Sequence, residues 1–587
     1  MGSVRHMKQA VPLTGPARRE AQTRRVPVLR ALFDRLFGRR EAAWLAPLVR
    51  PYRLPLAALF LLSLVTAAAA LVPPYLTKLV IDNGLMAGDK QALVFYVAVL
   101  FCVGLGALGL GALNSLLHLR FSARLLADLR RAAVARILMQ SPRWQARQSV
   151  GELMSRLDGD AGEVQQFTFA ALVTGGGSVL RLLGGLAMLF VLAPDLALLA
   201  LALAPVELIF VARARPVTHD RARAVRRARG HLASGLAETI AGLGALRALN
   251  AADSAADRIE TRQRDLVAAL MSSQIWSEVT RAVPMVLTAI LRGTVFLVGG
   301  LAVIDGTMQL GSLIAFTAYL GFLIGPMQSL ISLWHGQARM KAALDRLDEV
   351  MSAAPGVRDP EMPLAPGNGG GGLVLSNLAY AQAEGPPLFE QLSLSIPAGG
   401  KFRLSGPSGT GKSSLLSLLQ RHDDPDEGTI LLDGIDLRQL ALRDLRGAVA
   451  LVPQKGHVFS GSLCDNLRLG RGDVSDAEMH DVLRLVELDE RFAREGLATR
   501  LGEGGLDLSG GERQRLCLAR ALLQPFKVLL LDECLSEVDG ARVSRIMARI
   551  DARFGECTRI VVTHGGVDCY GDFDAELDLE RAGGPRR

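Results

Sequence analysis

Six long apolar segments occupy the first 350 residues of the chain. Most of them reach the roughly 20 residues that a helix needs to cross the hydrocarbon core of a membrane. Only Pro194-Asp195 separates the third segment from the fourth, which predicts a tight helical hairpin. The pattern predicts an all-α transmembrane domain of six helices, at Leu54–Leu76, Ala92–Leu117, Phe167–Ala193, Leu196–Ala212, Val283–Ile304 and Leu310–Leu333.

Basic residues are distributed unevenly around these segments. Twelve lysines and arginines, from Arg5 to Arg53, precede the first segment, and the connections after the second and fourth are rich in arginine. The connections after the third and fifth contain neither residue. Because lysine and arginine accumulate on the cytoplasmic side of membrane proteins, both termini and both long connections are predicted to be cytoplasmic. Each long connection, of roughly 50 to 70 residues, can extend as two helical legs of about 35–40 Å below the membrane.

The composition changes after Met351. A stretch rich in proline and glycine follows, and strand-like runs then alternate with helical stretches, which predicts a soluble α/β domain. The predicted parts are a basic cytoplasmic tail at 1–44 with an elbow helix near Val28–Phe37, a transmembrane domain with cytoplasmic helical extensions at 45–350, a linker at 351–372 and the α/β domain at 373–587. The predicted strands are Leu373–Leu378, Leu392–Ile396, Phe402–Leu404, Thr429–Leu432, Val449–Val452, Val528–Leu531 and Arg559–Val562.

A glycine-rich phosphate loop lies at the start of the α/β domain. Gly406–Ser413 reads GPSGTGKS and fits the pattern G-x-x-x-x-G-K-[ST], between a strand and a helix as that motif requires. The glycines let successive backbone N–H groups face one anion, Lys412 can reach the outer phosphates of ATP, and the Ser413 hydroxyl can hold Mg²⁺. The residues predicted to bind the nucleotide here are Gly406, Ser408, Gly409, Gly411, Lys412, Ser413 and Ser414.

Two further motifs complete the candidate chemistry. The apolar strand Val528–Leu531 runs into Asp532, predicted to hold Mg²⁺, and Glu533, predicted to orient or deprotonate the attacking water. Ser509, Gly510 and Gly511 form a second glycine-rich anion nest before a helix. Since the phosphate loop already holds one nucleotide, this nest is predicted to serve the nucleotide of another chain.

In order and spacing, these motifs resemble an ATP-binding cassette (ABC) exporter of the half-transporter type, over about residues 45–575. Leu508–Gln514 matches the family signature, with Glu512 where glutamine is commoner. The resemblance implies that Trp144–Leu153 and Arg247–Ile259 are coupling helices. The sequence departs from the family pattern at two places. Gly565-Gly566 follow His564, the residue that matches the switch histidine of the family, and the tail after Asp572 is short and acidic.

The resemblance assigns roles to four more residues. Tyr380 would stack on adenine, and Gln454 would sense Mg²⁺ and the membrane domain. Asp539 would link the two nucleotide sites, and His564 would contact the γ-phosphate. The implied catalytic residues are Glu533, His564 and Gln454, and the implied metal-site residues are Ser413, Gln454 and Asp532.

Three charged residues fall inside the apolar segments: Arg181, Glu207 and Arg292. Leaving three unpaired charges in lipid would cost roughly 8–10 kcal/mol on insertion scales. Two interpretations are open. The three line a central cavity and bind a polar or anionic group of the cargo, or Arg181 and Glu207 form a structural ion pair and Arg292 is solvated.

The sequence therefore predicts an ATP hydrolase coupled to export across the cytoplasmic membrane of a bacterium, with ATP and Mg²⁺ as cofactors. The predicted partner is a second copy of the chain, since one copy has Lys412, Glu533 and His564, or else a related half-transporter. The predicted cargo is small and amphipathic, drug-like or lipid-like. Alternatives are a modified peptide from a biosynthetic cluster, or an ATP-gated channel or regulator.

A soluble ATPase acting on DNA or ribosomes is disfavoured. The net charge of +8 would suit such a protein, but the six apolar segments and the mean hydropathy of +0.27 would not. The charge is attributed to the cytoplasmic loops, so no nucleic-acid partner is predicted. The six cysteines form no CxxC pair and are predicted to be reduced thiols.

Overall fold

The computed structural model describes residues 44–382, 386–469, 471, 473–563 and 567–580. Within helices, the side chains at positions 203, 204, 207, 208, 211 and 324 are outside this description. The described residues divide into two compact units, 44–130 with 158–347 and 131–157 with 348–580. A segment from the predicted transmembrane region, 131–157, thus groups with the α/β part of the chain. The predicted elbow helix Val28–Phe37 lies outside the described residues.

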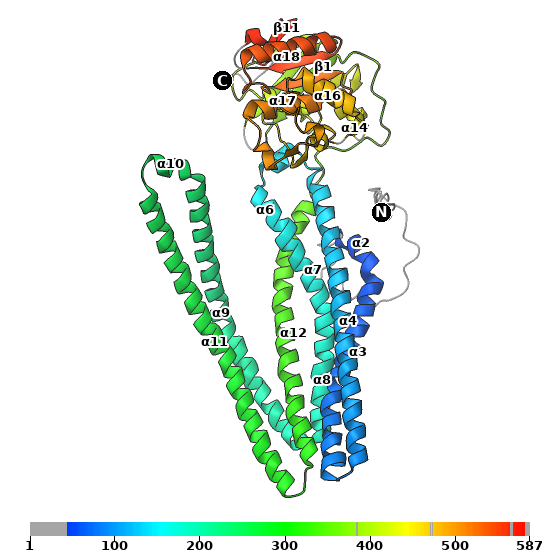
Figure 1. Cartoon of the computed structure of the whole chain (residues 1–587), viewed down its shortest axis with the longest axis vertical. Coiled ribbons are helices and arrows are strands. Elements are labelled where there is room, and N and C mark those ends of the chain that lie inside the picture. The colour runs from blue at the N-terminus through cyan, green and yellow to red at the C-terminus, as the bar shows by residue number, and fades with distance from the viewer. Residues whose placement is uncertain (1–43, 383–385, 470, 472, 564–566, 581–587) are drawn as a thin grey trace. The chain divides into compact units, whose positions relative to one another are not determined.

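The first unit is helical (Figure 1). Wider π-helical turns interrupt it at Val80–Met86 and Ala170–Gly175, and a third, Arg156–Asp160, spans the boundary with the second unit. Its helices are α2 (Leu45–Val49), α3 (Arg53–Leu79), α4 (Lys90–Ile137), α7 (Ala161–Phe169), α8 (Gly176–Leu192), α9 (Pro194–Ala241), α10 (Leu243–Ala248), α11 (Ala252–Ile304) and α12 (Leu310–Met351); α4 and α12 each run into the second unit at one end.

Five helical stretches among the described residues are long and apolar enough to cross a membrane, at Leu45–Met86, Lys90–Ile137, Val150–Leu192, Ala252–Ile304 and Leu310–Met351. The fourth predicted segment lies within α9, one continuous helix. The predicted hairpin before it is confirmed. Ala193 is extended, and Pro194 takes the first helical position of α9, where its fixed φ is favourable.

The predicted helical extensions are also present. Helices α4 and α9 have 48 residues each, about 72 Å of helix against a hydrocarbon core of about 30 Å. Helices α9 and α11 lie side by side, and α10 joins them at one end (Figure 1). Near the opposite end, Leu189, Val295 and Phe316 share a buried cluster.

The second unit contains two main sheets. The antiparallel sheet, in the order β2-β1-β4-β5, consists of β1 (Leu373–Ala381), β2 (Pro387–Ile396), β4 (Glu427–Leu432) and β5 (Ile435–Asp436). The parallel sheet, in the order β11-β3-β10-β9-β6, consists of β3 (Lys401–Ser405), β6 (Val449–Val452), β9 (Val528–Asp532), β10 (Thr558–Val562) and β11 (Ala575–Asp578). A short pair, β7 (Gly461–Ser462) and β8 (Arg500–Leu501), lies apart from both.

All seven predicted strands are confirmed, and β6 has the predicted bounds. Strands β9 and β10 are buried at every position, as near-continuous apolar strands of a parallel sheet should be. Strand β11 was not expected, because its sequence AELD is half acidic. It lies parallel to β3 at the sheet edge, and the buried Leu579 follows it.

Two helices of the second unit, α5 (Pro142–Ala146) and α6 (Val150–Ser155), come from the segment between α4 and α7, and the other six among the described residues lie in the connections between the strands. These six are α13 (Lys412–Leu419), α14 (Leu442–Ala448), α15 (Leu463–Leu467), α16 (Asp476–Leu485), α17 (Gly510–Leu522) and α18 (Gly540–Arg553). The predicted coupling helix Trp144–Leu153 covers the end of α5 and the start of α6. In the first unit, the predicted coupling helix Arg247–Ile259 covers the end of α10 and the start of α11.

Candidate functional site

Four segments with predicted site residues lie at one edge of the parallel sheet, each at the carboxyl end of a strand. The phosphate loop follows β3, Gln454 follows β6, Asp532 ends β9 with Glu533 next, and Thr563 follows β10. These four strands are adjacent and parallel, so their carboxyl ends face the same edge, where ligands bind in such folds. His564 was predicted to belong here, but it lies outside the described residues.

The phosphate loop depends on three glycines. Gly406, Gly409 and Gly411 have φ of 145°, 87° and 90°, which glycine adopts without strain. At Gly411 a Cβ atom would also lie 2.8 Å from Cζ of Phe389 in β2, whereas Gly409 has open space around it. Ser408 and Ser413 are exposed and Ser414 is half-buried. The loop therefore leaves two hydroxyl-bearing residues exposed next to the start of α13 (Lys412–Leu419).

Lys412 is buried beneath this loop. Its Nζ atom donates hydrogen bonds to the carbonyl oxygens of Gly406 (2.7 Å) and Pro407 (2.9 Å). Burial lowers the pKa of the Lys412 ammonium, and the nearby charges of Glu533 and Asp532 oppose this shift. Both acceptors belong to the phosphate loop, so the Lys412 ammonium lies against the backbone of that loop.

Glu533 is held in an uncommon backbone conformation. Its φ is +47°, and its backbone N–H donates to the carbonyl of Val562 at 3.1 Å. Its carboxylate accepts a 2.7 Å hydrogen bond from Nε2 of Gln454. Left-handed backbone at a non-glycine residue is costly and gathers at functional sites. Asp532, one residue earlier, is buried.

Cys534 follows Glu533 but is not a candidate nucleophile. Complete burial raises the pKa of its thiol to about 12, so the thiol stays protonated near neutral pH. All six cysteines are free, as predicted for reduced thiols.

The second glycine-rich nest lies at the first turn of α17. Ser509 caps this helix, with Glu512 completing a reciprocal capping box through the backbone N–H of Ser509 at 2.8 Å. Burial would raise the pKa of Glu512, but the hydrogen bonds from Ser509 and the charges of Arg491 and Arg515 lower it overall. Since glutamate and glutamine both close a capping box, the departure at Glu512 preserves the local fold.

The nest packs on the loop that follows β9. A Cβ atom on Gly511 would lie 2.8 Å from the carbonyl oxygen of Glu537. The buried Gln514 donates to the Ser536 hydroxyl at 3.1 Å and accepts from the Glu537 N–H at 2.9 Å. Asp539 then caps α18, accepting from the N–H of Arg542. The loop from Glu533 to Asp539 is thereby tied to α17.

Tyr380, the predicted adenine platform, is covered in this structure. Tyr380 as a whole is only 6% exposed, and the guanidinium carbon of Arg143 lies 4.1 Å from the centroid of its ring. Its hydroxyl donates to Asp423 at 3.4 Å. Arg143 comes from α5 and was not among the predicted site residues. The only signal was its place between the Ser141-Pro142 start of a helix and Trp144, where the predicted coupling helix begins.

The intramembrane charges do not come together in the described contacts. Nε of Arg181 in α8 donates to its own helix, at the carbonyl of Gly177 (3.3 Å). Arg292 in α11 is exposed. Glu207 lies in α9, but its side chain is outside the described residues. The predicted Arg181–Glu207 pair therefore stays a prediction.

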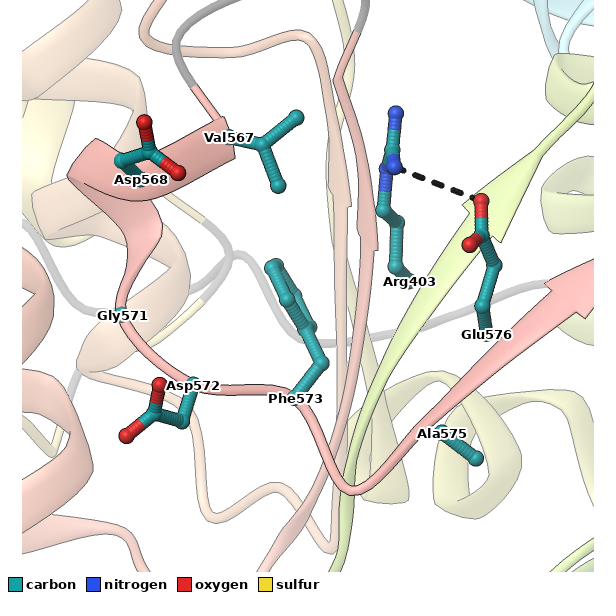
Figure 2. Close-up of a pocket in the computed structure, with 8 residues that line it drawn as sticks. All are labelled: Arg403, Val567, Asp568, Gly571, Asp572, Phe573, Ala575 and Glu576. Atoms are coloured by element: carbon teal, nitrogen blue, oxygen red, sulfur yellow. Dashed lines mark ion pairs between the residues drawn. The ribbon is translucent and has the colours of Figure 1, made fainter.

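A hollow of about 490 Å³ lies at the outer edge of the parallel sheet (Figure 2). Its lining includes Phe573, Asp568 and the ion pair between Arg403 and Glu576, at 3.3 Å. It shares no residue with the phosphate loop among the described positions, so we do not assign the nucleotide to it.

Comparison with known proteins agrees with this arrangement. The family described as "ABC transporter transmembrane region" matches residues 56–327, and the family described as "ABC transporter" matches residues 389–536. An uncharacterized ABC transporter ATP-binding protein of Mycobacterium tuberculosis is 31% identical over 532 residues, which cover 88% of this chain and 89% of that protein.

Two further comparisons extend this result. The multidrug resistance-like ATP-binding protein MdlA of Escherichia coli is 29% identical over 88% of this chain and 87% of its own length. A bacterial Atm1-family ABC exporter solved with ATP bound has the same fold, with a TM-score of 0.73 at 22% identity over 92% of this chain and 95% of that chain. The chain belongs to the ABC transporter family, as an exporter in which a helical transmembrane domain is fused to an ATP-hydrolysing nucleotide-binding domain.

Proposed function

We propose that this chain dimerises through its nucleotide-binding domains and exports a small amphipathic molecule across the bacterial inner membrane. The observation that carries the proposal is the sheet edge where the phosphate loop, Gln454, Asp532 and Glu533 meet. We also propose that the chain consists of four parts, with boundaries after residues 44, 350 and 372, and that both termini lie in the cytoplasm.

Mg²⁺ fits the residues at this edge. Mg²⁺ in nucleotide enzymes uses one or two protein oxygens together with the phosphates of the substrate. The buried carboxylate of Asp532 and the exposed hydroxyl of Ser413 are such ligands, and the Gln454 amide is a third candidate. When bound, the metal would neutralise charge on the phosphates.

Glu533 and its neighbours supply the protein's part of hydrolysis. Its carboxylate orients the attacking water or accepts its proton, and Gln454 fixes the direction of that carboxylate. Lys412 exchanges its two carbonyl acceptors for phosphate oxygens, which fixes the leaving group. His564 is proposed to contact the γ-phosphate, and Tyr380 to stack on the base.

The exposed Ser509 supports the dimer. It starts α17 with its hydroxyl and the Gly510-Gly511 backbone at the helix N-terminus, where anions bind favourably. We propose that this nest closes over the nucleotide held by Lys412 and Ser413 of a second copy, with Asp539 between the two sites.

The cargo class rests on the relatives and on the membrane charges. Several relatives carry multidrug names, including MdlA and a multidrug efflux protein of Mycobacterium tuberculosis. Arg181, Glu207 and Arg292 are proposed to line the cavity for a polar or anionic group of such a molecule.

The test is Glu533→Gln in the full-length protein, reconstituted in lipid vesicles. This variant is expected to bind ATP as the wild type does, while its turnover falls by about 10²- to 10⁴-fold. Wild-type turnover in this variant would remove Glu533 from the reaction. Transport of a fluorescent dye into sealed vesicles, measured in parallel, separates an exporter from an ATPase that moves no cargo.

A further inference from the structure

Arg143 lies in the second unit, at the base of the phosphate-loop helix. Its Nη1 atom is 2.8 Å from Asp426 and its Nε atom 2.9 Å from Asp423, two carboxylates that follow α13. Asp426 also accepts a 2.9 Å hydrogen bond from the N–H of Ala381, so the carboxylates are fixed relative to β1. The guanidinium is thus held in place over the ring of Tyr380.

The ring beneath it adjoins the phosphate loop. Tyr380 in β1 pairs with Phe389 in β2, and Phe389 is the side chain that a Cβ on Gly411 would meet. Tyr380 is therefore one strand away from the loop that binds the phosphates. This is the separation expected between the base and the phosphates of one nucleotide, and it supports the assignment of Tyr380 to the base.

Adenine cannot stack on Tyr380 as the side chain stands. Tyr380 is 6% exposed and belongs to the buried cluster that it forms with residues of β2 and α13. The guanidinium at 4.1 Å fills the space that a stacked base would need. A planar cation over an aromatic face is itself a favourable contact, so adenine must compete with it.

We propose that Arg143 occupies the adenine position of the nucleotide-free protein, and that ATP displaces it from the Tyr380 ring. This rests on the proposed role of Tyr380. Arg143 is thus a positioning residue that lowers ATP affinity by the fraction of molecules whose ring is covered. By thermodynamic linkage, bound ATP lowers the equilibrium constant for the contact between Arg143 of α5 and the Tyr380 ring by the same factor.

The experiment compares two ligands on the full-length protein in detergent without Mg²⁺. ATP carries a base, and inorganic tripolyphosphate does not. Arg143→Ala is expected to bind ATP about 3- to 30-fold more tightly, the range of one cation–π contact, with unchanged affinity for tripolyphosphate. Arg143→Lys keeps a cation beside Asp423 and Asp426 but loses the planar group, and should show a smaller gain for ATP only.

Arg147→Ala is the matched control, because it removes an exposed arginine of the same segment. It should leave both affinities unchanged. Unchanged or weaker ATP binding by Arg143→Ala overturns the proposal, and so does an equal gain for both ligands.

Tyr380→Leu distinguishes the proposed role of Tyr380 from that of Arg143. It should weaken ATP binding and leave tripolyphosphate binding intact, which also reports a folded domain. If this variant binds ATP normally, then Tyr380 is not the adenine platform and the proposal falls with that assignment. If it weakens ATP binding while Arg143→Ala has no effect, only the proposal about Arg143 is overturned.

Discussion

The side-chain amide of Gln454 donates a 2.7 Å hydrogen bond to the carboxylate of Glu533. The two residues follow neighbouring strands, β6 and β9, and lie 79 positions apart in the sequence. The backbone of Glu533 has a left-handed conformation, and the hydrogen bond from Gln454 restricts the orientation of the Glu533 side chain. The candidate base is therefore oriented before any substrate arrives.

Gln454→Ala removes that orienting hydrogen bond. We expect kcat for ATP hydrolysis to fall by about 10- to 100-fold, the usual effect of a slightly misplaced catalytic group. ATP binding without Mg²⁺ should change by less than about threefold, as measured by titration. An unchanged kcat would show that the hydrogen bond has no catalytic role.

Gln454→Glu tests the electrostatics of the same pair. A second carboxylate beside Glu533 would repel it and could not donate the hydrogen bond that the Gln454 amide donates. We expect kcat for ATP hydrolysis to fall at least as far as in Gln454→Ala, measured at saturating ATP and Mg²⁺. A kcat above that of Gln454→Ala would show that the repulsion has no effect on the reaction.

The two glycines of the α17 nest should differ in their tolerance of a methyl group. In Gly511→Ala the new Cβ lies 2.8 Å from the backbone oxygen of Glu537, so the loop after β9 must shift. We expect a loss of about 1–3 kcal/mol, or roughly 3–10 °C in the unfolding midpoint. In Gly510→Ala the methyl overlaps only the end of the exposed Glu537 side chain, which can rotate away, so we expect less than about 2 °C. Equal losses would contradict this packing.

Arg292→Ala tests the cavity proposal. If Arg292 contacts cargo, the ratio of cargo-stimulated to basal ATPase should fall by several-fold in vesicles given an anionic amphiphile. Arg281→Ala is the control on the same helix, since that arginine pairs with Glu278 at 3.3 Å. Equal stimulation in wild type and Arg292→Ala would leave Arg292 as a solvated residue without a role in cargo binding.

Leu579 should matter more than its position near the end of the chain suggests. It is fully buried, and its N–H donates to Ser405, just before the phosphate loop. Leu579→Ala is expected to cost about 2–4 kcal/mol, seen as a lower unfolding midpoint of the full-length protein. Glu580→Ala, at the exposed neighbouring position, should stay within about 0.5 kcal/mol.

The sequence predicted most of the fold because its strongest signals are local. Apolar runs of membrane length need no tertiary information, and neither do the buried strands β6, β9 and β10. The phosphate loop, Gln454 and the Asp532-Glu533 pair follow strands directly, so their meeting at one edge follows from parallel strand order. Strand β11 was missed because AELD carries two acids and acquires its strand state only by pairing with β3.

Contacts between distant segments could not be predicted in this way. Arg143 and Asp426 are 283 positions apart, and no pattern along the chain links them. The same holds for the cover over Tyr380, which depends on a helix that the sequence places with the membrane region.

The buried amide of Gln514 has one more consequence. It clamps Ser536 and Glu537, three and four residues after Glu533, to the helix whose first turn is proposed to grip the neighbouring copy's nucleotide. In such a dimer, a movement of the loop after Glu533 during ATP hydrolysis at one site would also move α17, which contacts the nucleotide at the other site. Hydrolysis at the two sites would then be coupled, and a substitution that impairs one site would slow both.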